Sequence, residues 1–116
     1  MSLLYRNKNL SEPWFSLIKF KIKQVEGRLN KPGDFRDMKV GDEIEFTNID
    51  FGFQRSYIVK IKSISYYPSF KKYLKDEGIE RCLPTVDDIE DGVDVYYKYY
   101  TPADEANYGI KAFTFE

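Results

Sequence analysis

The segment Lys23–Asn30 holds the densest set of side chains that could bind or transform a polar ligand. It reads Lys-Gln-Val-Glu-Gly-Arg-Leu-Asn, in which polar and apolar residues alternate as they do along a β-strand. If residues 24–29 form a strand, its apolar side chains face a core. Its polar side chains then share the opposite face, and these are Gln24, Glu26, Arg28 and Asn30.

This polar face offers hydrogen-bond donors and acceptors in a fixed order. The Arg28 guanidinium can bind a phosphate or a carboxylate through two parallel hydrogen bonds. Glu26 can accept a hydrogen bond from an amino or hydroxyl group, and Lys23 can add a point charge at the same mouth. The spacing also fits an ordinary Glu26–Arg28 ion pair on a solvated sheet face, because exposed alternation is common in antiparallel sheets.

The composition limits the chemistry available to this face. The 116 residues include no histidine, so the usual general base is absent. With Cys82 as the single cysteine, a zinc site is disfavoured and an internal disulfide is excluded. Any catalysis would depend on Lys, Glu, Asp, Tyr, Ser or Thr, with at most a Mg²⁺ or Mn²⁺ ion held by carboxylates. The acidic run at residues 87–94 is better explained as charge at a helix N-terminus. We therefore predict neither a cofactor nor a metal site.

Cysteine usage and hydropathy bear on cellular location. A single cysteine fits a reducing compartment. No apolar run approaches the roughly 18–20 residues of a membrane helix, and the first residues lack the apolar stretch of a signal peptide. These features predict a cytoplasmic protein that does not associate with membranes.

The net charge of −1 conceals two oppositely charged halves. Residues 1–75 contain 15 Lys and Arg against 8 Asp and Glu, whereas residues 76–116 contain 3 against 11. The basic half can attract phosphates. Lys60 and Lys62 share one face of a predicted strand and could extend a phosphate-binding surface, although solvated strand faces often carry lysines as well.

Aromatic side chains could supply a stacking surface for a base. Trp14 begins a predicted amphipathic helix, where packing in the core or at its rim is the commoner role. The pairs Tyr96–Tyr97 and Tyr99–Tyr100 cannot all point inward from one helix, so at least one of these rings should be exposed. An exposed ring beside a basic mouth would favour nucleobase binding.

The elements that must position these residues form a mixed α+β pattern, and the length predicts a single domain over residues 1–116. Alternation predicts strands over residues 3–9, 24–29, 43–47, 55–67 and 109–115. Helices are predicted from an N-cap at Ser11 to about residue 20, from an N-cap at Ser69 to Gly78, and from Leu83 onward. Because no regular βαβ rhythm is present, we predict a small, partly closed β-barrel with helices at its rim.

The segment from Leu17 to Asn30 resembles the ASCH domain of the PUA-like superfamily, whose signature is Gly-x-Lys-x-x-Glu-x-Arg. Lys23, Glu26 and Arg28 fall on its Lys, Glu and Arg. Similar flanks extend the resemblance to nearly the whole chain: Pro13-Trp-Phe-Ser-Leu-Ile, Met38-Lys-Val-Gly-Asp-Glu-Ile, Tyr73-Leu, Cys82-Leu-Pro and Tyr108-Gly-Ile-Lys-Ala-Phe. Lys21 stands where the family usually has glycine, which suggests a turn that lacks glycine's positive φ.

The resemblance implies a PUA-like β-barrel in which the motif residues line a cleft between barrel and helices. Related domains bind RNA or modified bases, some resemble ribonucleases, and one small bacterial branch removes the acetyl group from N(4)-acetylcytidine. In that branch a Lys and a Thr of the motif act with a downstream Glu. Lys23 matches that Lys, but Glu26 occupies the Thr position, so the nucleophilic hydroxyl is absent. Glu77 and Glu80 are the candidates for the downstream carboxylate.

Functions of different classes follow from this motif. In the first, the protein holds RNA or a modified nucleobase in the cleft through Arg28, Asn30, Trp14, Lys21, Lys60 and Lys62. In the alternative, it is a small hydrolase of a nucleoside or RNA, in which Glu26 activates water and Lys23 stabilises developing negative charge. In a third, the motif serves only the structure of an interaction domain, and an ion pair between Glu26 and Arg28 that is sealed from solvent would favour it.

Overall fold

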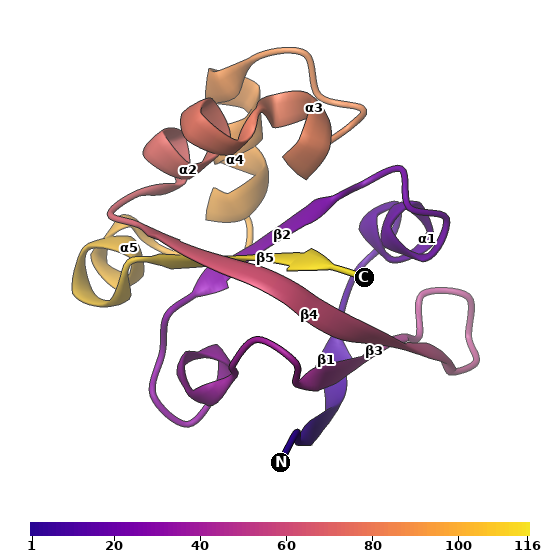
Figure 1. Cartoon of the computed structure of the whole chain (residues 1–116). Coiled ribbons are helices and arrows are strands. Elements are labelled where there is room, and N and C mark those ends of the chain that lie inside the picture. The colour runs from indigo at the N-terminus through magenta and orange to yellow at the C-terminus, as the bar shows by residue number, and fades with distance from the viewer.

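The computed structural model describes residues 1–116, and its longest strand, β4 (Arg55–Tyr67), connects two halves of one sheet. The first half of β4 pairs antiparallel with β3 (Glu43–Asn48), and the second half pairs antiparallel with β5 (Ile110–Phe115). β1 (Leu4–Asn9) lies parallel to β3 at one edge, and β2 (Val25–Leu29) lies antiparallel to β5 at the other. The strand order is therefore β1-β3-β4-β5-β2 (Figure 1).

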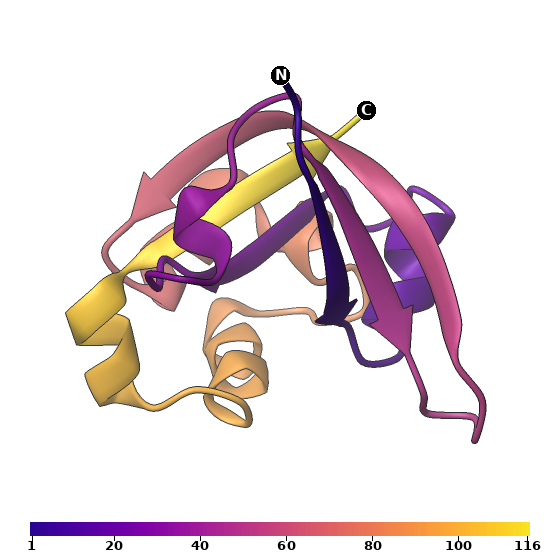
Figure 2. The same ribbon diagram turned by 90° about the horizontal axis from the view of Figure 1, so that it is seen from below.

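The sheet is curved but does not close. Pairing along β4 is irregular between Ile61 and Ser63, and Figure 2 shows β4 as a long arc. β1 and β2 are edge strands that pair with no further strand. The mixture of helices and strands confirms the α+β class. The partly closed barrel is not confirmed, because no backbone ladder joins the edge strands β1 and β2.

Five α-helices and one 3-10 helix occupy the connections between strands. In Figure 1, α2, α3 and α4 gather on one side of the sheet, while α1 lies near the start of β2 and α5 leads into β5. Their bounds are Trp14–Lys19 for α1, Phe70–Glu77 for α2, Ile79–Cys82 for α3, Ile89–Tyr97 for α4, Pro102–Tyr108 for α5 and Phe35–Asp37 for the 3-10 helix. None of the helices is long and apolar enough to cross a membrane.

The helices α2 and α5 begin at side chains that accept hydrogen bonds from free backbone N–H groups. Ser69 caps α2 as predicted, since its side chain accepts a hydrogen bond from the Lys72 N–H, and Gly78 follows the last residue at φ 93°. Thr101 and Asp104 form a reciprocal capping box at the start of α5. That signal is present in the sequence, although α3 and α5 were not among the predicted helices.

Two helix starts differ from the prediction. α1 begins at Trp14 without a cap from Ser11, because the Ser11 hydroxyl is hydrogen-bonded to the Tyr99 hydroxyl instead. The helix expected from Leu83 begins only at Ile89. There the Asp88 side chain accepts a hydrogen bond from a backbone N–H of the first turn, so the cap sets the start of α4.

A hydrophobic core of 21 buried residues joins the sheet to the helices. The Phe70 ring of α2 stacks on the Tyr96 ring of α4, with 4.5 Å between their centroids, and Tyr73 meets Tyr96 edge-on. The Tyr73 and Tyr96 hydroxyls are 3.0 Å apart and hydrogen-bonded, which satisfies two buried polar groups. This packing fixes the position of α4 against α2.

Candidate functional site

A cavity of about 400 Å³ opens at the seam between the two edge strands, β1 and β2. Its lining comes from these strands, the start of α1, the beginning of the 3-10 helix with the residue before it, and α4 with the residues that follow it. The Arg28 side chain bridges the seam, since its Nη2 donates a hydrogen bond to the Asn9 carbonyl at 2.7 Å. We call this cavity the cleft.

Three motif residues form an ion cluster in the wall of the cleft. Lys23 Nζ lies 3.3 Å from Glu26 Oε1, and Arg28 Nε donates to Glu26 Oε2 at 2.7 Å. Lys23 Nζ also donates to the carbonyls of Val25, at 2.6 Å, and Cys82, so two of its N–H groups bond backbone carbonyls in addition to the ion pair with Glu26. The side chains of Glu26 and Arg28 retain 5% and 14% of their exposure and line the cleft, so the pair is not sealed from solvent.

The cluster controls the protonation of its members. Burial raises the pKa of the Glu26 carboxyl, but the charges of Arg28 and Lys23 outweigh burial, so this pKa lies below its ordinary value. Burial lowers the pKa of the Lys23 ammonium, and the Glu26 carboxylate opposes this only in part. Burial, with Glu26 next in importance, raises the pKa of Tyr96 well above its ordinary value, so this phenol stays neutral.

Aromatic rings supply much of the cleft wall. The Arg28 guanidinium lies 4.9 Å from the centre of the Phe35 ring, and the Lys23 ammonium lies 5.8 Å from that of Trp14. Tyr99 is 58% exposed, which confirms that at least one of the clustered tyrosines faces solvent. The aromatic residues of the wall are Trp14, Phe35, Tyr96, Tyr99 and Tyr100.

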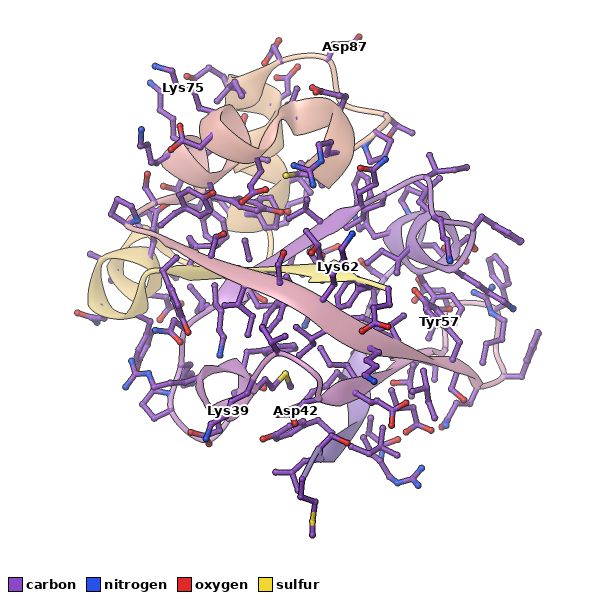
Figure 3. All side chains as sticks on the ribbon, in the orientation of Figure 1. Lys39, Asp42, Tyr57, Lys62, Lys75 and Asp87 are labelled. Carbon is purple, nitrogen blue, oxygen red and sulfur yellow. The ribbon has the colours of Figure 1, made fainter.

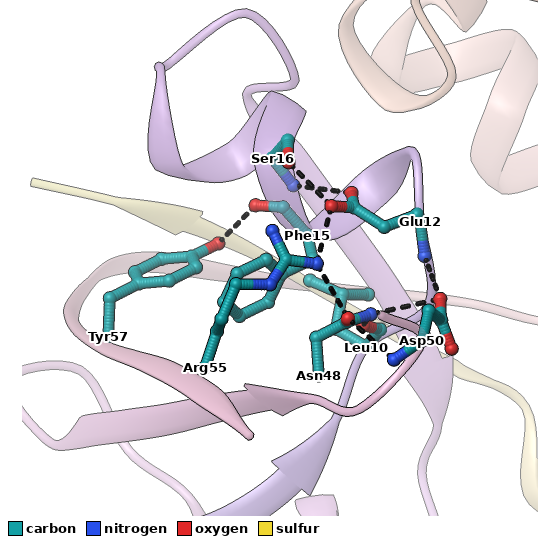
Figure 4. Close-up of polar contacts among 8 residues, drawn as sticks. All are labelled: Leu10, Glu12, Phe15, Ser16, Asn48, Asp50, Arg55 and Tyr57. Carbon is teal, nitrogen blue, oxygen red and sulfur yellow. Dashed lines mark hydrogen bonds and ion pairs between the residues drawn. The ribbon is translucent and has the colours of Figure 1, made fainter. Parts of the chain in front are cut away.

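A polar network beside the β3–β4 hairpin fixes the start of α1 (Figure 4). Arg55 Nη2 donates to Glu12 Oε2 at 2.8 Å and to the Asn48 side-chain oxygen at 2.7 Å. Glu12 also accepts hydrogen bonds from the Ser16 N–H at 3.0 Å and the Ser16 hydroxyl at 2.6 Å. Because Trp14 lies between Glu12 and Ser16 in the chain, the network fixes one aromatic wall of the cleft.

A buried lysine fixes the loop at residues 31–38, which contains the 3-10 helix and contributes Phe35. Lys111 of β5 is fully buried and its ammonium donates to three backbone carbonyls, those of Phe35 at 3.0 Å, Arg36 at 2.9 Å and Met38 at 2.6 Å. At the start of the same loop, Asp34 pairs with Lys8 of β1 at 2.7 Å. The loop is thereby attached both to β5 and to the edge strand across the seam.

Gly27 allows β2 to approach α2 closely. A Cβ atom added at Gly27 would lie 2.5 Å from a ring atom of Tyr73. Tyr73 is fully buried and hydrogen-bonded to Tyr96, so its ring has little room to move. The glycine therefore permits the approach that brings β2, with its neighbours Glu26 and Arg28, against α2.

The ASCH domain family matches residues 9–116, which include every residue of the ion cluster. This chain belongs to the ASCH domain family. The crystal structure of hypothetical protein PH0355 is 39% identical, with a TM-score of 0.83 over 98% of this chain and 97% of that one. The solution NMR structure of protein PF0455 from Pyrococcus furiosus is 36% identical, with a TM-score of 0.76 over 97% of this chain and 96% of that one. No curated protein gives a significant match.

The remaining residues predicted to bind a ligand do not all line the cleft of this ASCH domain. Trp14 lines the cleft and also packs in the core. Asn30 lies outside the cleft, and its side-chain oxygen is buried without a hydrogen-bond partner. Lys21, Lys60 and Lys62 line a second, open hollow of about 750 Å³, which we call the basic hollow.

The two candidates for a downstream carboxylate also lie outside the cleft of the ASCH domain. Glu77 accepts a hydrogen bond from the Tyr67 hydroxyl and pairs with Arg81 at 3.3 Å. Glu80 is exposed. The carboxylates that line the cleft are instead Glu26 and Asp34, each beside a cation, and the structure contains no group of three or more His, Cys, Asp or Glu side chains that could hold a metal ion.

Lys21 corrects one expectation about the ASCH signature. Its φ is 63°, so the prediction of a turn without positive φ is wrong. The N–H of Lys21 bonds the Ile18 carbonyl and that of Ile22 bonds the Leu17 carbonyl, which closes the end of α1. These hydrogen bonds hold Lys21 in the left-handed region that a glycine would enter more easily.

β1 and the 31–38 loop add residues to the cleft of the ASCH domain that were not among the predicted site residues. Asn9, Lys8, Asp34 and Phe35 all line it. No local pattern marks them, since β1 approaches β2 only because the sheet curves, and no strand-to-strand ladder links the two edges.

Proposed function

We propose that the cleft binds a single nucleobase, presented by RNA or by a modified nucleoside. The observation that carries the proposal is the Glu26 carboxylate, held by two cations in a cavity with aromatic walls. A volume of about 400 Å³ lies within the range of small-molecule sites, which is about 300–1,000 Å³. Membership of the ASCH family supports the same class of ligand.

Glu26 supplies the polar recognition in this proposal. An ionised carboxylate only accepts hydrogen bonds and has about four acceptor positions. Lys23 contacts one oxygen and Arg28 the other, which leaves acceptor positions for a ligand. Glu26 therefore favours a base edge that presents N–H groups, such as the exocyclic amine of cytosine, adenine or guanine. The exposed Tyr99 ring offers a face for stacking.

The same geometry favours binding over hydrolysis. Lys23 donates to two backbone carbonyls and pairs with Glu26, so its ammonium has little capacity left to stabilise a reacting oxygen. The lowered pKa of Glu26 makes its carboxylate a weak base towards water. An amidohydrolase or ribonuclease activity at the cleft is the alternative, and it requires Glu26 to act as that base.

Calorimetric titration of the full chain with nucleosides, including N(4)-acetylcytidine, and with short single-stranded RNA tests the proposal. Tyr99→Ala removes a stacking face, and we expect a loss of about 1–3 kcal/mol in binding free energy, typical of one base–aromatic stack. The matched control is Tyr66→Ala on β4, because Tyr66 is 62% exposed and lies outside the cleft.

The variants separate the outcomes. Equal affinity of Tyr99→Ala and Tyr66→Ala for every ligand would contradict base binding in the cleft, as would the absence of any binding by the unmodified chain. Chromatography of the same mixtures measures turnover. The unmodified chain could form products that Glu26→Gln does not form, although circular dichroism shows the variant to be folded. That result would contradict the binding proposal and support the hydrolase.

A further inference from the structure

The basic hollow lies between the end of α1, the middle of β4 and the end of β5. Figure 3 labels Lys62 on β4, well separated from Lys75 and Asp87 at the helical end of the molecule. The lysines that line the hollow are Lys19, Lys21, Lys60, Lys62 and the buried Lys23, and Arg81 adds a further cation. The only acidic residues in the lining are Glu43 and Glu116, so the lining carries a net positive charge.

Four of these lysines are free to meet a ligand. Lys19, Lys21, Lys60 and Lys62 are exposed, and none of them forms an ion pair within the protein. Two exposed lysines of α2 behave differently, because Lys71 pairs with Glu90 at 3.4 Å and Lys72 pairs with Asp76 at 3.1 Å. Unpaired cations gathered in one concavity create a positive potential that attracts a polyanion.

The hollow and the cleft are neighbouring cavities that share Lys23 in their linings. Trp14, at the first turn of α1, lines the cleft, and Lys19, its last residue, lines the hollow. The six residues of this helix span about 9 Å at about 1.5 Å per residue. Lys23 lines both cavities, so a chain molecule anchored in one meets the other within a short distance.

We infer that the basic hollow binds the phosphates of the RNA strand whose base occupies the cleft. This inference rests on the proposed function, since the cleft supplies the anchor point. Exposed lysines on flexible stems contact phosphates as point charges and require no base sequence. The cleft then selects one base, and the hollow holds the neighbouring backbone.

Fluorescence anisotropy with a single-stranded RNA of about ten nucleotides, a typical site size, tests the inference over about 50–200 mM salt. The variant Lys60→Gln/Lys62→Gln removes two cations of the hollow, and Lys71→Gln/Lys72→Gln removes two from α2 as the matched control. We expect the first variant to reduce the slope of log affinity against log salt by about 1.4, since each single-strand contact contributes about 0.7. The control slope and the affinity for a free nucleoside should not change.

Each result has one interpretation. If Lys60→Gln/Lys62→Gln matches the control while Tyr99→Ala still weakens nucleoside binding, the inference about the hollow is wrong and the proposed function stands. If the RNA slope falls but Tyr99→Ala binds nucleosides and RNA as the unmodified chain does, the strand is not anchored in the cleft and the inference also fails. Competition by polyglutamate as effective as by RNA of equal charge would assign the hollow to an acidic protein instead.

Discussion

The cleft and the basic hollow use cations in opposite ways, although they share a boundary at Lys23. In the cleft, Lys23 and Arg28 are largely buried and both contact the Glu26 carboxylate. In the hollow, Lys60 and Lys62 are exposed and unpaired. Fixed and desolvated groups discriminate between ligands, whereas exposed charges attract polyanions in general and are screened by salt.

Burial also makes the charges of the cleft depend on one another. Removing one member of a buried ion cluster leaves the others without a counter-charge in a medium that solvates them poorly. An exposed lysine, by contrast, can lose its charge with little effect on folding, because water already solvates it. Substitutions in the two regions should therefore differ in their effect on the free energy of unfolding.

The largest effect is expected for Glu26→Gln. The change leaves Lys23 and Arg28 beside a neutral amide, and we expect a loss of about 3–5 kcal/mol in the free energy of unfolding. Urea denaturation followed by circular dichroism measures it. Glu90→Gln is the control, since Glu90 forms an exposed pair with Lys71. Equal stability of the two variants would show that the cluster contributes nothing to folding.

Glu26→Gln also tests how the free energy of unfolding depends on pH. The pKa of Glu26 is lowered in the folded state, so its contribution is present above the ordinary glutamate value of about 4.3 and is lost as the pH falls through the folded-state pKa. The stability difference between the unmodified chain and Glu26→Gln should therefore shrink as the solution is acidified across this range. A difference that stays constant in acid would contradict the lowered pKa.

A smaller loss is expected for Gly27→Ala. The new methyl group would lie 2.5 Å from the Tyr73 ring, and overpacking of this kind costs about 1–3 kcal/mol. Thermal and urea unfolding measure the loss. Because β2 must shift to accommodate the methyl group, binding in the cleft should weaken as well. Unchanged stability would mean that Tyr73 moves aside, and the tight packing described for the cleft would then be mistaken.

At the rim of the hollow, Lys21→Gly should act in the opposite direction. Lys21 has a φ of 63°, a region that costs a non-glycine residue about 1–2 kcal/mol. Glycine removes this cost but adds flexibility to the unfolded chain, so we expect a net gain of at most about 1 kcal/mol. Urea denaturation measures it, and a clear loss of stability would show that the lysine side chain has a structural role.

The smallest effect is expected for Lys60→Gln/Lys62→Gln in the absence of ligand. Both side chains are exposed and unpaired, so the free energy of unfolding should change by less than about 0.5 kcal/mol. The measurement is the same denaturation series. A large loss would place these lysines in the structural framework and remove the contrast with the cleft.

Local patterns were sufficient for elements whose limits are set by adjacent residues. Alternation predicted β4 over residues 55–67, and the Ser69 cap with Gly78 predicted α2. The start of α4 was misplaced at Leu83 because two plausible starts compete there, and the Asp88 cap determines the outcome. The turn at Lys21 was also misjudged, since the hydrogen bonds that close α1 hold a lysine at positive φ.

From the residues alone, the chemistry of the motif could be derived, because charge, hydrogen-bonding capacity and two-residue alternation are properties of Lys23, Glu26 and Arg28 and their spacing. The placement of the cleft could not. It depends on the curvature of β4, which brings β1 opposite β2, and on distant contacts such as those of Lys111 with the Phe35 loop. For the same reason Lys60 and Lys62 lie in a separate hollow: which cations share a cavity is decided by long-range packing, which no local spacing encodes.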